Sequence, residues 1–286
     1  MMGRLTPTIP LPPAAVRRRL ALLAGLAVVG AAVFFLLRGP WPQDPTYHAF
    51  ADSYPLLGVP NALNVLSNAP FLLVGALGIA LVLRRRDAFL DPAEAWPYFV
   101  FFVGVGLTAF GSGYYHLDPT NPRLVWDRLP IAMAFMALFA AVIGERAGVR
   151  LGLVLLGPLM ALGLGSVLYW TVGESRGQGD LRPYYFVQGY PLVAIPLMLV
   201  LFPPRYTRGY DLLIGIAWYA AAKVCEGYDR EIYRLLGETV SGHTIKHLLS
   251  AAGAFWVWRL LALRRPYGHV TPGPQRGPDS REPSAP

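Results

Sequence analysis

The sequence is poor in cysteine, lysine and charged side chains in general. Cys225 is the only cysteine, so no disulfide can form within the chain, and cysteine usage does not indicate the redox compartment. Charged residues make up only 15% of the chain and hydrophobic residues 54%, against about 25% and about 45–50% in soluble domains. This shortage of polar side chains excludes an ordinary soluble domain and predicts a membrane protein.

Long apolar runs are abundant instead. About 20 helical residues, rising about 1.5 Å each, cross a bilayer core of about 30 Å. The eight expected spans are Leu20–Leu37, Ala62–Leu83, Pro97–Tyr115, Leu129–Ile143, Leu151–Trp170, Tyr184–Phe202, Leu212–Val224 and His243–Leu263. The fourth and the seventh are short for a span. The sequence therefore predicts an all-α, polytopic membrane helical bundle.

The two ends of the chain differ in character. The run Leu20–Leu37 follows the basic triplet Arg17–Arg19, a pattern shared by signal peptides and membrane anchors. It is longer than the usual apolar core of a signal peptide, and no clear small-residue cleavage site follows it. We therefore expect a retained first helix after a cytoplasmic segment, residues 1–19. Residues 266–286 are rich in Pro, Gly and charge, which predicts a disordered cytoplasmic tail.

The distribution of charge predicts the orientation. With a cytoplasmic amino terminus, the inner segments hold most of the arginines: Arg4, Arg17–Arg19, Arg84–Arg86, Arg146, Arg150, Arg205, Arg208, Arg264 and Arg265. The outer segments hold most of the acids: Asp44, Asp52, Asp118, Asp127, Glu174, Asp180, Glu226, Asp229, Glu231 and Glu238. Because arginine favours cytoplasmic loops, both termini are expected in the cytoplasm.

The excess of positive charge has a membrane explanation as well. The net charge of +8 is spread over short loops and forms no docking face, so no nucleic-acid partner is expected. Lysine is nearly absent, arginine supplies almost all of the basic side chains, and Ala, Gly and Pro are abundant. This composition is typical of a GC-rich bacterial genome. We expect a bacterial plasma membrane protein, and nothing in the sequence indicates an obligate protein partner.

Ionisable residues gather at the ends of three predicted spans. The third span ends in Ser112-Gly113-Tyr114-Tyr115-His116, and Trp126-Asp127-Arg128 comes before the fourth. The eighth span opens with His243-Thr244-Ile245-Lys246-His247. Such groups cost about 2.5–3.5 kcal/mol each within a membrane on insertion scales, so they indicate a functional site by default.

The helical spacing and the alternation of the spans across the membrane are expected to bring these residues together. Ser112 and His116 are four residues apart, as are His243 and His247, so each pair shares a helix face. An i,i+4 histidine pair offers two imidazoles to one metal ion, and a third histidine leaves a fourth position open for water. The alternating spans bring both pairs and Asp127 to the same outer face. A lone histidine there is usually only a polar cap, but this combination predicts a metal site.

In order and spacing, these residues resemble a known family. Ser112-Gly113-Tyr114-Tyr115-His116, Asp127 and His243-Thr244-Ile245-Lys246-His247 are similar to the motifs of the alkaline ceramidases. These belong to the CREST superfamily of membrane hydrolases, which includes the progestin/adiponectin-type receptors. The stretch Gly58–Asn68 resembles the first core helix of the family, and the likeness covers roughly residues 47–263. It implies a seven-helix core, to which Leu20–Leu37 adds one helix.

The resemblance also implies an activity. A member would be a zinc-dependent hydrolase that takes a ceramide-like lipid from the bilayer and cleaves its amide bond to a fatty acid and a sphingoid-type amine. Zinc would be held by His116, His243 and His247, with Asp127 as the proton acceptor and Ser112 as the stabiliser of the oxyanion. Two alternatives stay open: hydrolysis of a lipid ester, and a receptor-like or ligand-binding bundle with a structural zinc.

Several other polar residues are interpreted without a catalytic role. Three asparagines share a helix face and are read as interhelical hydrogen-bonding groups: Asn61, Asn64 and Asn68. Lys223 and Glu226 are expected to pair, and Lys246 to snorkel or find an acidic partner. His48 and His269 fall in loop and tail and are expected to be solvated. The acid-rich calcium-binding segment of the eukaryotic ceramidases has little counterpart here beyond Asp52, so no calcium site is expected.

Overall fold

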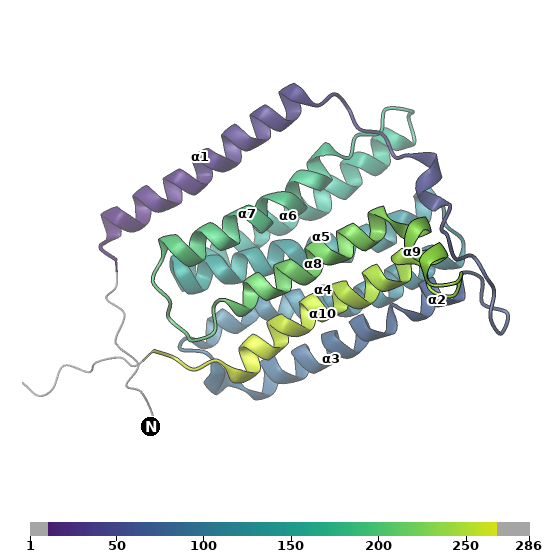
Figure 1. Ribbon diagram of the computed structural model, residues 1–286. Coiled ribbons are helices and arrows are strands. Elements are labelled where there is room, and N and C mark those ends of the chain that lie inside the picture. The colour runs from purple at the N-terminus through teal and green to yellow at the C-terminus, as the bar shows by residue number, and fades with distance from the viewer. Residues whose placement is uncertain (1–10, 268–286) are drawn as a thin grey trace, which may run out of the picture.

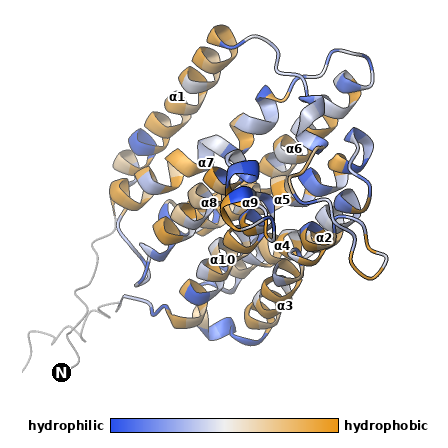
Figure 2. Cartoon of the chain, turned by 45° about the vertical axis from the view of Figure 1, so that its right-hand side comes forward, coloured by the Kyte–Doolittle hydropathy of each residue, from blue (hydrophilic) through white to orange (hydrophobic). Residues whose placement is uncertain are grey.

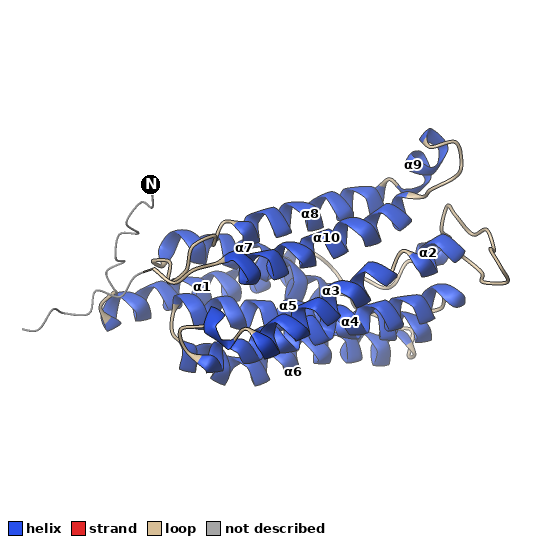
Figure 3. Cartoon of the chain, turned by 90° about the horizontal axis from the view of Figure 1, so that it is seen from below, coloured by secondary structure: helices blue, strands red, loops and turns tan. Residues whose placement is uncertain are grey.

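The fold is a bundle of α-helices in a computed structural model that describes residues 11–267 (Figures 1 and 3). The α-helices are α1 (Pro13–Leu37), α2 (Ala62–Leu66), α3 (Ala69–Arg84), α4 (Ala95–Leu117), α5 (Asn121–Arg146), α6 (Val149–Glu174), α7 (Arg182–Leu201), α8 (Asp211–Gly227), α9 (Asp229–Leu235) and α10 (Gly242–Leu263). The connections contain the 3-10 turns Pro45–His48, Arg86–Ala88 and Pro92–Glu94. No β-strand occurs within residues 11–267, so the predicted all-α fold is confirmed.

Some expectations fall on parts of the chain that are not described. The first ten residues of the predicted segment 1–19 and nearly all of the predicted tail 266–286 lie outside the described residues. His269 is among them.

Within residues 11–267, six helices are long and apolar enough to cross a membrane: α1, the combined span Ala62–Arg84, the span Pro92–Leu117, α5, α6 and α7. Helix α8 is shorter, at 17 residues, and α10 carries the polar stretch His243–His247 in its first two turns. Both still run along the other helices (Figure 1). Figure 2 shows the helices mainly in the hydrophobic colour. These features indicate a membrane protein.

Two predicted spans prove too short. The sequence predicts Leu129–Ile143 and Leu212–Val224, whereas α5 covers Asn121–Arg146 and α8 covers Asp211–Gly227. An apolar run marks only the middle of a helix, because backbone hydrogen bonding continues through polar residues at either end. In consequence Asp127 does not begin the fourth span but lies about two turns inside it.

The long helices alternate in direction, so the two ends of the bundle differ. The described beginning of α1 and the end of α10 lie at one end of the bundle, while α2 and α9 lie at the other (Figure 1). Helix α5 is the most buried of the candidate spans and packs chiefly between α4 and α6. It therefore forms the centre of the bundle.

Glycine allows the helices to approach closely at two crossings. A Cβ on Gly75 of α3 would collide with the backbone of Gly106 on α4, and one on Gly152 of α6 with the backbone of Gly144 on α5. Small residues at helix crossings are the usual means of close packing in membranes, where lipid tails are as apolar as leucine. These contacts hold α3, α4, α5 and α6 tightly together.

Helix α1 stands at the edge of the bundle. Its main packing partner is α7 (Figure 1). Two polar contacts fix it there: Tyr190 Oη donates to the carbonyl of Leu23 at 2.7 Å, and Arg19 donates to the carbonyl of Leu201. Helix α1 thus lies beside a bundle formed by α2 to α10.

Candidate metal centre

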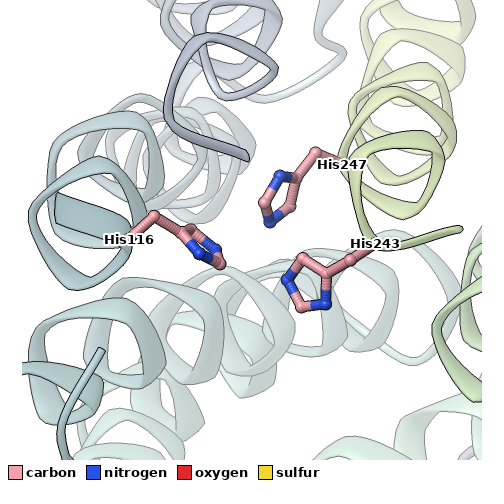
Figure 4. A group of neighbouring side chains, drawn as sticks. All are labelled: His116, His243 and His247. Atoms are coloured by element: carbon pink, nitrogen blue, oxygen red, sulfur yellow. The ribbon is translucent and has the colours of Figure 1, made fainter. Parts of the chain in front are cut away.

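Three histidines converge at the end of the bundle where α2 and α9 lie (Figure 4). His116 is in the last turn of α4, and His243 and His247 are in the first two turns of α10. One ring nitrogen of each lies within 4.8 Å of those of the other two. The ring centroids are 4.8–5.0 Å apart in all three pairs. The structure thus brings together the three histidines that the sequence predicts as ligands.

The start of α10 is held by several polar contacts. Ser241 caps the helix, its Oγ accepting a hydrogen bond from the Thr244 amide at 3.1 Å. The carboxylate of Asp229 accepts a hydrogen bond from the backbone amide of His243 at 2.7 Å. Gly242 is required at this position because a Cβ there would collide with the backbone of Cys225 and Asp229. Together these contacts fix the register in which both histidines face α4.

The histidines fit a bound metal ion. They are 1%, 3% and 2% exposed for His116, His243 and His247, respectively. Among the described residues, Nδ1 of His116 and Nε2 of His247 have no hydrogen-bond partner. A buried polar atom without a partner costs about 1–3 kcal/mol, and coordination to a metal would remove that cost. Neutral imidazoles suit a divalent transition metal better than magnesium or calcium.

Hydrogen bonds orient the histidines. The hydroxyl of Ser67 donates to the carbonyl of Asn64 at 3.2 Å, which leaves its oxygen to accept from Nδ1–H of His247 at 2.8 Å. This assignment leaves Nε2 of His247 unprotonated and free to bind a metal. Asn61 Nδ2 donates to the carbonyl of His116 at 2.8 Å. The Ser67 contact is of the kind that fixes both the tautomer and the ring orientation of a metal ligand, whereas the Asn61 contact holds the backbone of His116.

The interpretation of the asparagine face is confirmed in part. Thr244 Oγ1 of α10 donates to Asn64 Oδ1 of α2 at 3.0 Å, and Asn61 reaches α4, so both make interhelical hydrogen bonds. Asn68 instead donates to the carbonyl of Asn64 within its own segment, at 2.7 Å. The role of Ser67 beside His247 is additional, and only the three-dimensional packing reveals it.

The connection between α1 and α2 covers the metal centre, which sequence analysis does not predict. The ring of Phe50 lies 4.7 Å from that of His116 and 4.5 Å from that of His243, centroid to centroid. His48 is half-buried rather than solvated, contrary to prediction, because its ring contacts Tyr115 Oη at 2.8 Å and Asn121 Oδ1 at 2.9 Å. The only signal in the sequence was the number of aromatic residues in this connection.

The same connection is anchored on the segment between α6 and α7. The Trp41 amide donates to Asp180 Oδ1 at 3.2 Å, and the Leu181 amide donates to the Trp41 carbonyl at 2.8 Å. Burial acts to raise the pKa of Asp180, but hydrogen bonds from the Arg182 side chain and from the backbone outweigh it and hold this pKa below its ordinary value. Asp180 therefore stays ionised at neutral pH and keeps the connection between α1 and α2 in place.

One cavity extends from His247 of the histidine cluster into the interior of the bundle. Its walls come from α3, α4, α5, α7, α8 and α10 and from the connection between α1 and α2. The end near the histidines is lined by polar residues: Tyr47, Ser112, Asp127, Arg128, Tyr184, Lys223, Glu226, Lys246 and His247. Deeper residues are apolar: Phe101, Val105, Phe135, Leu138, Leu192, Ile195, Leu212, Ile216, Ala254 and Val257. The cavity is therefore amphipathic along its length.

Ser112 and Asp127, the predicted catalytic pair, both line this cavity with His247. Ser112 is 1% exposed, and its Oγ has no hydrogen-bond partner among the described residues. Asp127 is 5% exposed and is not part of the cluster of candidate ligands. Both side chains are thus available to a bound molecule rather than committed to the fold.

The expected ion pairs are present at the polar end of the cavity. Lys223 pairs with Glu226, and Lys246 Nζ lies 3.1 Å from Glu226 Oε1, so both predictions about these residues are confirmed. Tyr47 Oη also donates to Glu226 Oε1, at 3.1 Å. The Glu226 carboxylate therefore contacts two lysines and a tyrosine, and Tyr47 joins the connection between α1 and α2 to α8.

Comparison with known proteins adds no further information about the site. No protein-family model matches the chain, and no curated protein matches it significantly.

Proposed function

We propose that this chain is a zinc-dependent integral-membrane hydrolase of the alkaline ceramidase type, which cleaves the amide bond of a ceramide-like lipid. One observation carries the proposal: three buried histidines can hold a metal ion, and one of them, His247, lines the polar end of a largely apolar cavity. Ser112 and Asp127, the residues that resemble the catalytic pair of that family, are in the cavity wall. The combination matches a metal hydrolase that acts on a molecule with one long apolar chain.

The donor set favours a catalytic zinc site. Three imidazoles and an open fourth position characterise catalytic zinc, whereas structural zinc has four protein ligands. Within residues 11–267 the cluster has three members, and Asp127 is not a fourth. A bound zinc ion would supply Lewis acidity toward the scissile carbonyl and would make water a better nucleophile. This favours hydrolysis over the receptor-like alternative.

The chain's own residues have defined roles in the reaction. As water adds its oxygen to the amide carbonyl carbon, Asp127 accepts a proton from that water. The Ser112 hydroxyl donates a hydrogen bond to the oxygen on which negative charge develops. The C–N bond then breaks, and Asp127 passes its proton to the departing nitrogen. The products are a fatty acid and an amine, and Asp127 is again ionised.

The apolar part of the cavity supports a lipid substrate. On α5 the lining extends from Asp127 to Leu138, and on α10 from His247 to Val257. Ten or eleven helical residues correspond to about 15–16 Å at about 1.5 Å each. A cavity of this depth suits an acyl chain that lies along the helices, with its amide or ester group at the histidine end.

The arginine-rich loops support an orientation. Arg84–Arg86, Arg146, Arg150, Arg205, Arg208, Arg264 and Arg265 are in or beside connections at the end of the bundle opposite the histidines. The positive-inside rule then puts both termini in the cytoplasm and the metal site on the extracytoplasmic side of a bacterial plasma membrane. In this arrangement α8 and α10 also cross, which makes eight spans.

The proposal is tested with the purified full-length protein. Elemental analysis should find about one zinc per chain in protein prepared without chelator. Incubation with a ceramide should release fatty acid and amine, and chelator should abolish the release. A lipid ester of matched chain length, tested in parallel, identifies the bond that is cleaved. Protein without a transition metal, or release that persists with chelator, would contradict the proposal.

A further inference from the structure

Within the described part of the chain, Arg128 is a buried cation without an acidic partner. It follows Asp127 on α5, is 4% exposed and lines the polar end of the cavity. Its Nη2 donates to Gln43 Oε1 at 2.5 Å, but Nη1 has no hydrogen-bond partner within residues 11–267. The guanidinium lies 4.2 Å from the ring centroid of Trp170 and 5.1 Å from that of Tyr184. Aromatic rings and one amide therefore hold it in a fixed position.

Within residues 11–267 no neighbouring carboxylate forms an ion pair with Arg128, and two of these carboxylates are committed elsewhere. Glu226 pairs with both Lys223 and Lys246. Glu174 accepts hydrogen bonds from Trp170 Nε1 at 3.1 Å and from Asn121 Nδ2 at 3.1 Å. Asp127 is the adjacent residue, and side chains at i and i+1 of a helix do not face each other. A buried charge normally has a partner, because leaving water is costly for an ion. The free donor on Arg128 therefore indicates a missing partner.

The polar end of the cavity carries an excess of positive charge. Its side chains include three cations, Arg128, Lys223 and Lys246, against the two carboxylates of Asp127 and Glu226. A cleft with apolar walls concentrates the field of such charges and attracts molecules of the opposite sign. A neutral lipid head group would leave this excess uncompensated, whereas an anionic one would balance it.

We propose that Arg128 binds an anionic group, a phosphate or a sulfonate, on the head of the lipid. The planar guanidinium suits the oxygens of such groups better than an ammonium does. Because Asp127 and Arg128 both line the polar end of the cavity, the anion would lie close to the reacting bond. The claim that this anion belongs to the head group of a substrate rests on the proposed hydrolase function. The claim that Arg128 binds an anionic amphiphile does not.

The first experiment measures binding without turnover. Dodecyl phosphate, dodecyl sulfonate, dodecanol and inorganic phosphate are titrated into the purified protein in neutral detergent, before and after chelator treatment, with tryptophan fluorescence as the signal. Both anionic amphiphiles should bind at least tenfold more tightly than dodecanol, and the preference should survive chelation. Inorganic phosphate should bind weakly, since it lacks the apolar chain. Equal affinity for dodecanol and the two anions would overturn the proposal.

Variants separate this role from a structural one. Arg128→Gln should reduce the preference for anions by about 10- to 100-fold, the usual effect of losing a charged hydrogen-bond donor. Arg128→Lys should reduce it less, because the charge remains. Arg123→Gln, on the same helix and in an exposed pair with Asp118, is the matched control and should keep the preference. If Arg128→Gln does not fold, the test relies on Arg128→Lys. A preference for anions in Arg128→Lys as large as in wild type would contradict the proposal.

The second experiment connects the anion to the reaction. Wild type and variants receive an N-acyl sphinganine and its 1-phosphate, with identical acyl chains. The ratio of kcat/KM for the phosphate over the alcohol should exceed ten in wild type and fall at least tenfold in Arg128→Gln. Hydrolysis of both lipids without preference would overturn this inference and leave the hydrolase proposal intact. Selective binding of the anionic lipid without hydrolysis of either lipid would support the role of Arg128 and contradict the hydrolase proposal.

Discussion

The histidine cluster depends on small polar residues around it. Ser67 has a single hydroxyl proton, which it gives to the Asn64 carbonyl, so its oxygen is left to accept from His247. That sets the tautomer of His247 and points its unprotonated nitrogen at the other two rings. The candidate metal site therefore depends on a residue from a different helix segment that is not itself a candidate ligand.

Ser67→Ala should weaken zinc binding about 10- to 100-fold, the usual effect of removing an outer contact of a metal ligand. Zinc affinity is measured by competition with a chromophoric chelator. Ser166→Ala is the matched control, since its hydroxyl makes a similar local bond, to the Gly163 carbonyl at 2.7 Å, on α6, which does not line the cavity. Equal zinc affinity of the two variants would contradict the assigned role of Ser67.

Replacing His247 and Asp127 separates ligand from base. His247→Ala removes one of three imidazoles, so zinc content and activity should both fall. Asp127→Asn keeps the shape of the side chain but removes the base, so zinc should largely stay while turnover falls by about 10²–10⁴. Zinc occupancy and turnover are measured on the same preparations. Loss of zinc from Asp127→Asn as complete as from His247→Ala would make Asp127 a fourth ligand and favour the receptor-like function.

Ser112→Ala should keep its zinc and lose turnover by about 10²–10³, the effect of removing one oxyanion donor. The loss should appear mainly in kcat, because the hydrogen bond forms as charge develops in the transition state. Steady-state kinetics with the lipid substrate check this. A rise in KM with unchanged kcat would instead assign Ser112 to substrate binding.

At the scale of the elements, the crossing of α4 and α5 sets the geometry of Ser112 and Asp127, the proposed catalytic pair. Gly111 of α4 lies against the backbone of Trp126 on α5, and a Cβ there would collide with the Trp126 carbonyl. The residues that follow, Ser112 and Asp127, are thereby brought to one cavity wall. Close packing of the two backbones thus decides how near the side chains of Ser112 and Asp127 are.

Gly111→Ala should force α4 and α5 apart and lower the free energy of unfolding by about 1–3 kcal/mol, as overpacking does. Activity should fall with it, because Ser112 and Asp127 separate. Gly113→Ala is the control two residues further on, where a Cβ meets nothing within 4 Å. Thermal unfolding in detergent and turnover are measured for both. The prediction fails if the two variants are equally stable and active.

The connection from Gly39 to Pro60 is the second element that matters. Phe50 packs on two of the histidines, and Gln43 reaches Arg128, so this one segment covers both the metal centre and the polar end of the cavity. Trp41, near its start, is anchored on Asp180, and Ala51, near its middle, is anchored on Asp229 at 2.8 Å. These two contacts hold the part of the connection that includes Phe50 against the bundle.

At the scale of the whole molecule, the alternating helices place all the candidate chemistry at one end of the bundle. The last turn of α4 and the first turns of α5 and α10 meet there, although they are far apart in sequence. The arginine-rich connections meet at the other end. A membrane would therefore separate the metal site from the basic loops.

Reporter fusions test this topology. A fusion after Arg86, between α3 and α4, should report the cytoplasm, and a fusion after Asp118, between α4 and α5, should report the extracytoplasmic side. A reporter pair that is active on opposite sides of the membrane reads out both positions. Identical signals from the two fusions would contradict the orientation and the placement of the metal site.

The sequence by itself determined the helices and the candidate ligands. Apolar runs reveal spans because a bilayer requires about 20 apolar residues, and the spacing of His243 and His247 reveals a shared face because a helix repeats every 3.6 residues. Alternation of the spans then brought His116 to the same end. Each of these inferences depends on a periodicity or a count, which a sequence carries directly.

Only the tertiary structure decided the rest. The contacts of Ser67 with His247 and of Phe50 with His116 join residues from different elements, with no periodicity to predict them. The missing partner of Arg128 can be recognised only once every neighbouring carboxylate has been placed. Packing across elements has no local signature, because it depends on the relative positions of whole helices rather than on the order of residues within one.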